Sequence, residues 1–103
     1  MRIGAGCHIA GSIKGHEDIQ IDHGTRIDGS LIGAGNIYLV HDCQVRGPLL
    51  SERDIFLGPG CRIGTRQHRT TMNADHLYIA PGTVAFGTVR ARVMGTVRAG
   101  RAV

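Results

Sequence analysis

Apolar residues return at a fixed spacing of 18 positions along most of this chain. Between them, apolar positions alternate with polar residues over short stretches, which predicts short strands with one buried side. A repeat of this length is too short to contain two helices, so each repeat is expected to form one coil of a solenoid. The two clearest columns are Ile3, Ile21, Leu39 and Leu57, and Ile9, Ile27, Val45 and Ile63.

The coil over residues 7–24 shows how one repeat is built. Alternate positions from Ile9 to Ile13 form one face, and Ile19 and Ile21 form another. Glycine or small residues recur where the chain must bend between strands. We therefore predict about three short faces per coil around a dry interior of aliphatic side chains, stacked about 4.8 Å apart. The whole chain is then one all-β domain, a three-sided parallel β-helix with about 18 residues per coil.

The repeat is interrupted once, where the alternation is lost and one coil is four positions longer than the others. We expect a loop insertion at about residues 66–76, because solenoids place extra residues on the outside of the stack. The extra residues should bulge from one corner there. The columns that resume after the insertion are predicted to stack Ile79 with Val97, and Ala85 with Val103.

Composition and charge fit this fold and exclude others. Sixteen glycines and four aromatic residues, none of them tryptophan, suit stacked strands and tight bends better than a globular α/β core. No apolar run approaches the roughly 20 residues of a transmembrane helix, and the chain opens without a signal peptide, so we expect a cytoplasmic protein. The net charge of +4 is uneven. Residues 1–61 carry five basic and seven acidic side chains, and residues 62–103 carry seven basic and one acidic.

Cysteine and histidine are the residues that could carry chemistry. Cys7, Cys43 and Cys61 share one column, are odd in number and form no Cys-x-x-Cys pair, so we expect reduced thiols in the wall of the core. His23 and His41 should lie on adjacent coils at one corner, an arrangement that trimeric β-helix carbonic anhydrases use to bind zinc. No third ligand is evident. We therefore predict no metal, no cofactor and no catalytic residue.

Two surfaces are candidates for binding partners. Tyr38, Phe56 and Tyr78 occupy one outward column, where stacked rings either stiffen the sheet or form a lateral face for a partner or a second filament. A basic patch lies in the last part of the chain. It is either a solvated charged face or a contact with an anionic membrane surface, and no motif for specific nucleic-acid binding accompanies it. Its members are Arg62, Arg66, Arg69, Arg90, Arg92, Arg98 and Arg101.

Two stretches stand out within the repeat: the run from Leu77 to Gly87, and the pattern Ile9-x-Gly11-x-Ile13-x-Gly15 with Ile19-x-Ile21. They resemble the bactofilins, a family of polymer-forming bacterial cytoskeletal proteins, over about residues 7–87. The resemblance implies a right-handed β-helix that polymerises end to end without nucleotide. It also implies a scaffold role in cell shape, beside peptidoglycan-modifying enzymes and often at the membrane.

Both ends of the predicted rod lie inside the repeat pattern, with no sequence typical of a cap. Unpaired strand edges at the ends of a solenoid favour association with further chains. We therefore predict a homopolymer without catalytic activity. The alternative is a left-handed hexapeptide-repeat trimer, either an acyltransferase or a carbonic-anhydrase-like enzyme, although the hexapeptide pattern matches only one part of the coil. The predicted polymerisation interface contains Met1, Ile3, Phe86, Val97 and Val103.

Overall fold

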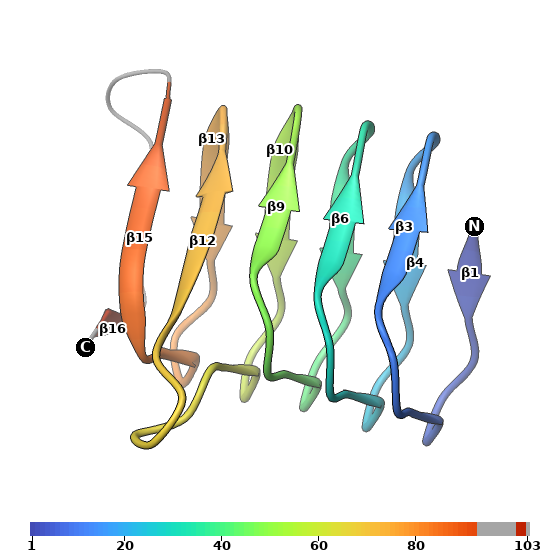
Figure 1. The fold of residues 1–103 in the computed structure, drawn as a ribbon, viewed down its shortest axis with the longest axis horizontal. Coiled ribbons are helices and arrows are strands. Elements are labelled where there is room, and N and C mark those ends of the chain that lie inside the picture. Colours follow the sequence, from blue (N-terminus) through green and yellow to red (C-terminus); the bar gives the residue numbers. More distant parts are fainter. Residues whose placement is uncertain (93–100, 103) are drawn as a thin grey trace.

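The computed structural model describes residues 1–92 and the backbone of residues 101–102, which form a parallel β-solenoid (Figure 1). Successive coils stack along one axis, and the strands of each coil join three separate sheets. This confirms the predicted all-β, three-sided parallel architecture. In the described part of the chain, no helix is long and apolar enough to cross a membrane.

The order of strands in each sheet follows the order of the coils, because each strand pairs with the equivalent strand of the preceding coil. Sheet A consists of β1 (Arg2–Ile3), β4 (Ile19–Ile21), β7 (Ile37–Leu39), β10 (Asp54–Leu57) and β13 (His76–Ile79). Sheet B consists of β2 (His8–Ile9), β5 (Arg26–Ile27), β8 (Gln44–Val45), β11 (Arg62–Ile63), β14 (Val84–Ala85) and β16 (Arg101–Ala102). Sheet C consists of β3 (Ile13–Gly15), β6 (Leu31–Gly33), β9 (Leu49–Ser51), β12 (Thr70–Ala74) and β15 (Gly87–Ala91).

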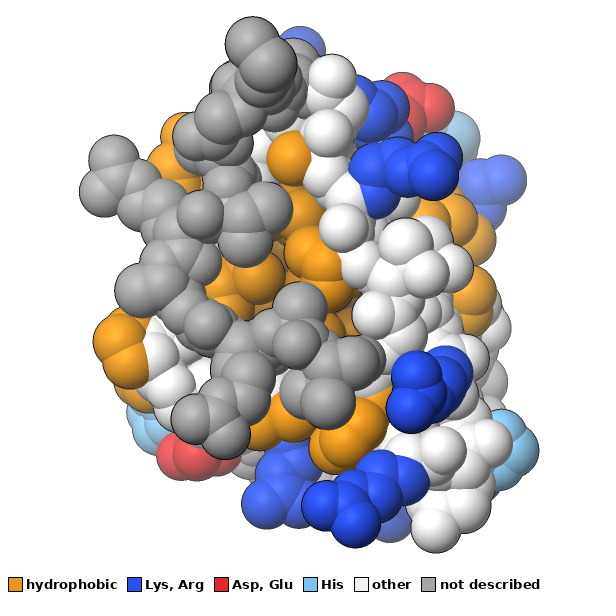
Figure 2. All heavy atoms as spheres, turned by 90° about the vertical axis from the view of Figure 1, so that its left-hand side faces the viewer, with side chains coloured by type: hydrophobic (Ala, Val, Ile, Leu, Met, Phe, Trp, Pro, Cys, Tyr) orange, Lys and Arg blue, Asp and Glu red, His pale blue; other side chains and the backbone are white. Residues whose placement is uncertain are grey.

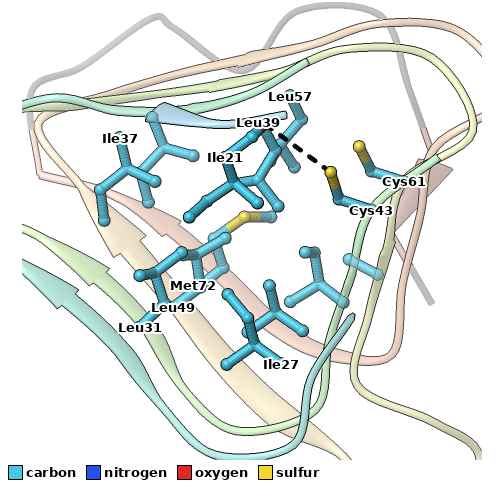
Figure 3. Packing of buried hydrophobic residues seen from close by; sticks show 14 of the residues in the cluster. Ile21, Ile27, Leu31, Ile37, Leu39, Cys43, Leu49, Leu57, Cys61 and Met72 are labelled. Carbon is cyan, nitrogen blue, oxygen red and sulfur yellow. Dashed lines mark hydrogen bonds between the residues drawn. The ribbon is translucent and has the colours of Figure 1, made fainter. Parts of the chain in front are cut away.

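The interior consists of aliphatic ladders, as the sequence columns predict. Ile21 pairs with Leu39, and Ile27 pairs with Val45, and all four side chains are buried. Figure 3 shows side chains from the three sheets pointing into a common centre. Their removal from water is the main favourable term in folding, worth about 25 cal/mol per Å² of apolar surface.

The loop at the insertion covers fewer residues in the structure than the sequence predicts. The expected loop at 66–76 is largely strand, because residues 70–74 form β12 and β13 follows directly. Between β11 and β12, residues 64–69 belong to no strand and form the corner between sheets B and C. The chain projects there beyond the other corners, at the lower left of Figure 1. The sequence does not predict β12, because polar residues break the apolar alternation there, although its inward residues Met72 and Ala74 are buried.

The pairing registers show how the extra residues are absorbed. In sheet A, Ile55 pairs with Leu77, so the step across the insertion exceeds a regular coil by the predicted four positions. In sheet C the step from Leu49 to Met72 is five positions longer than a regular coil. The next step in that sheet, from Met72 to Val89, is one position shorter than a regular coil. A longer step at one corner is therefore followed by a shorter one, and the three sheets stay in contact around one interior.

The predicted stacking of Ala85 with Val103 is wrong by one residue. Ala85 pairs with Ala102, so the last described step in sheet B is also one position shorter than a regular coil. A period averaged over the earlier coils cannot reveal such a shortened coil. The other predicted stack, Ile79 with Val97, lies outside the described residues.

Candidate assembly surfaces

The N-terminal end of the solenoid presents an unpaired strand edge in each sheet. Within the described residues, β1, β2 and β3 each pair with a strand on one side only. Met1 lies at this edge, where its ammonium group donates a hydrogen bond to the carbonyl oxygen of Asp18 at 2.8 Å and its side chain lies over Gly15. The structure thus places Met1 and Ile3 at the same open end. Their part in polymerisation stays a prediction.

Apolar side chains at this edge are less buried than their counterparts inside the stack. Ile3 and Ile9 are partly exposed, whereas Ile21 and Ile27, the next residues in the same columns, are 0 % exposed. The cause is geometric, because an interior residue is covered by coils on both sides and an edge residue by one. A further coil stacked at strand spacing would bury Ile3 and Ile9 in the same way.

The C-terminal end contains only part of the predicted interface. Figure 2 faces this end and shows apolar side chains near its centre, with several Lys and Arg side chains toward the rim. Val97 and Val103 lie outside the described residues. Phe86 follows β14, which is covered by β16, and its side chain lines a groove on the side of the rod. Its part in polymerisation also stays a prediction.

The outward aromatic column stacks as the repeat predicts. The ring centroids of Tyr38 and Phe56 are 4.9 Å apart, those of Phe56 and Tyr78 are 4.8 Å apart, and the rings are nearly parallel. The column borders a shallow groove of about 760 Å³ whose lining includes the exposed Val40. Such cross-strand pairs stabilise a sheet by about 0.2–1 kcal/mol each. A lateral contact with a partner on this face stays a prediction.

The predicted basic patch divides into separate groups. Arg62 and Arg66 line the groove on the side of the rod. Arg92 lies at another corner, where its Nε is 3.0 Å from Oδ1 of Asp75. The remaining members are Arg69, exposed in the 64–69 loop, Arg90, exposed on sheet C, and Arg98 and Arg101, whose side chains lie outside the described residues.

Two arginines of that groove were missed by the sequence analysis. Arg26 and Arg46 belong to the regular coils, and the groove brings them beside Arg62 and Arg66. Arg26 and Arg62 lie in one outward column of sheet B, with Gln44 between them. The same regular spacing that identifies the core could therefore have found this pair.

Cys43 and Cys61 lie side by side in the wall of the core, as their shared column predicts (Figure 3). The backbone N–H of Arg62 donates to the carbonyl oxygen of Cys43 at 2.8 Å, which places the two cysteines on adjacent coils. The neighbouring Cys61 thiol lowers the pKa of Cys43, although burial acts in the opposite direction. The same contact, together with burial, raises the pKa of Cys61. Both are free thiols, as is the half-buried Cys7.

The two corner histidines also lie where the repeat predicts. The rings of His23 and His41 stack with their centroids 4.9 Å apart. Nδ1 of His41 lies 2.9 Å from Oδ2 of Asp42. Among the residues that the structure describes, no group of three or more His, Cys, Asp or Glu side chains is close enough together to hold a metal ion.

Comparison with known proteins found no matching family model, no matching curated protein and no matching solved structure. The fold and the surfaces of the chain itself are therefore the basis for inferring its function. The bactofilin resemblance remains a hypothesis that rests on sequence motifs.

Proposed function

We propose that this protein is a structural scaffold that forms nucleotide-independent filaments by end-to-end stacking of its β-solenoids. The observation that carries the proposal is the open N-terminal edge, where the free edges of three parallel sheets lie beside partly exposed isoleucines. Free strand edges associate readily, because their backbone N–H and C=O groups lack protein partners. A second chain that stacks on this edge pairs these groups and buries Ile3 and Ile9.

The corner glycines indicate that the edge has room for another backbone. A Cβ atom on Gly47 would lie 2.6 Å from the carbonyl carbon of Gly29 in the preceding coil. The regular interior coils, with Gly29 and Gly47, therefore require glycine at this corner. A Cβ atom on Gly11, the equivalent residue at the edge, would meet no atom within 4 Å. The fold of the single chain does not need glycine at position 11. A neighbouring chain stacked there at strand spacing would leave no room for a Cβ atom.

The proposal includes a cytoplasmic location and a role in cell shape or envelope organisation. Three free cysteines, two of them adjacent in the core wall, suit a reducing compartment. The partners in this proposal are further copies of the chain and, through the bactofilin resemblance, peptidoglycan-modifying enzymes.

The test is a substitution that blocks the edge without disturbing the core. We expect the unsubstituted protein to form filaments in negative-stain electron micrographs and to sediment on ultracentrifugation. Gly11→Asp adds bulk and charge at a position where an added Cβ atom meets no other atom of the chain within 4 Å. It should lower the association constant more than about 100-fold, because a charge buried unpaired at the joint costs about 3 kcal/mol or more.

The matched control is Gln67→Asp, which adds the same charge to the exposed side loop and should leave the filaments intact. Circular dichroism shows whether both variants keep their β-structure. Discrete trimers of the unsubstituted protein would contradict the proposal and favour the hexapeptide-repeat alternative. Filaments of Gly11→Asp that match those of the unsubstituted protein would contradict it as well.

A further inference from the structure

The groove on the side of the rod is built independently of the two ends. Its volume is about 640 Å³, and it lies against the outward face of sheet B, with residues of the 64–69 loop and Phe86 in its lining. The loop is closed by its own hydrogen bonds. The N–H of Thr65 donates to the carbonyl oxygen of His68 at 3.0 Å, and the N–H of His68 donates to Oγ1 of Thr65 at 2.9 Å. The wall of the groove is therefore formed before any ligand arrives.

Positive charge is concentrated in this groove. Asp28 is the carboxylate in the described lining, and it pairs with the Nε of Arg26 at 2.9 Å. The other three arginines make no ion pair with another described residue. With His68 neutral, four arginines and one aspartate leave the lining with a formal charge of +3. The four are Arg26, Arg46, Arg62 and Arg66.

The repeat sets the backbone spacing of two of these arginines. Arg26 and Arg62 are two coils apart in the outward column of sheet B. At the spacing of paired strands, their backbones lie about 9.6 Å apart along the rod. Gln44 lies between them and adds a neutral hydrogen-bond donor. A ligand that contacts both arginines therefore bridges side chains from two separate coils.

We propose that this groove binds an anion of the diphosphate class, with two linked phosphoryl groups. Guanidinium groups bind phosphoryl oxygens in bidentate geometry. A diphosphate carries about three negative charges at neutral pH, which balances the charge of the lining. The groove is larger than a bare diphosphate, and Phe86 provides an apolar contact for an organic group attached to it. This site does not depend on end-to-end assembly.

The test is calorimetric titration of the full chain with inorganic pyrophosphate at low ionic strength. We expect saturable binding, and binding of inorganic monophosphate at least about tenfold weaker because monophosphate reaches fewer arginines. The double variant Arg46→Gln/Arg62→Gln should lose about 100-fold in affinity for pyrophosphate. In nuclear magnetic resonance spectra, pyrophosphate should shift the amide signals of Thr65 and His68.

The matched control is Arg53→Gln/Arg90→Gln, which removes the same charge from two exposed arginines outside the groove lining and should keep its affinity. Absence of pyrophosphate binding would overturn the proposal. Equal losses in the two double variants would also overturn it, because they would show non-specific attraction. A second arm uses vesicles of phosphatidylglycerol and phosphatidylcholine. Groove-dependent binding of these vesicles without binding of pyrophosphate would reject the diphosphate and indicate a lipid surface.

Discussion

The corner after β8 and the corner after β11 join the same two sheets in different ways. Residues 46–48 form the regular corner, and residues 64–69 form the inserted one. The strands around both corners nevertheless pair in register, Val45 with Ile63 before the corner and Leu49 with Met72 after it. A solenoid therefore confines irregular residues to a corner, because the hydrogen bonds between coils hold the strands on either side.

The two corners differ in what they offer to other molecules. Regular corners stack with little space between coils, as the close approach of Gly47 to Gly29 shows. The inserted corner projects from the stack and supplies Thr65, Arg66 and His68 to a groove that regular coils alone do not form. In the functions proposed above, the regular repeat would stack whole chains, and the break in the repeat would bind a ligand.

The largest expected effect is on stability. It tests whether the core is packed as tightly beside the inserted corner as beside the regular corner. Leu49 and Met72 occupy one inward column and are 0 % and 1 % exposed. Leu49→Ala and Met72→Ala should each lower the free energy of unfolding by about 2–5 kcal/mol. Urea unfolding in the Gly11→Asp background measures the change in the free energy of unfolding without a contribution from assembly. A cost below about 1 kcal/mol for Met72→Ala alone would show that the inserted coil is loosely packed.

An intermediate effect is expected at the strand that follows the inserted coil. Gly87 has a φ of 128°, and a Cβ atom there would collide with the carbonyl oxygen of Thr70. Gly87→Ala should therefore lower the free energy of unfolding by about 1–3 kcal/mol. Gly11→Ala, at the equivalent position of the first coil, is the control and should change it by less than about 0.5 kcal/mol. Equal stability of the two variants in urea would mean that β15 can move away from β12.

The smallest effect concerns Asp28, the carboxylate that the regular coils contribute to the groove lining. Hydrogen bonds from His8 and Arg26 lower the pKa of Asp28 below its usual value of 3.8. A carboxyl whose pKa is lower in the folded state stabilises the protein above its unfolded pKa, and this contribution is lost as the pH falls below about 4. Asp28→Asn should therefore flatten the fall in melting temperature below about pH 4. The effect should be small and should shrink with added salt, since the pair is exposed.

The parts of the candidate surfaces that follow the repeat directly were predictable. Tyr38 and Phe56, like His23 and His41, are separated by one coil, and both pairs stack in the structure. The groove was not predicted, because its lining combines several coils with a loop that obeys no repeat. Arg46 in particular belongs to the acidic first part of the chain and was not considered a member of a basic surface.

By itself, the sequence determined the stacked coils, the three faces and the inward columns. Parallel pairing at a constant step requires only local alternation and fixed spacing, and both are visible in the chain. The tertiary structure alone decided which residues of the irregular stretch become strand. Thr70 donates its N–H to the carbonyl oxygen of Phe86 at 2.9 Å, and Asp75 donates its N–H to the carbonyl oxygen of Arg53 at 2.6 Å. Pairing with neighbouring coils on both sides outweighs the weak local pattern there, since buried backbone groups must be satisfied.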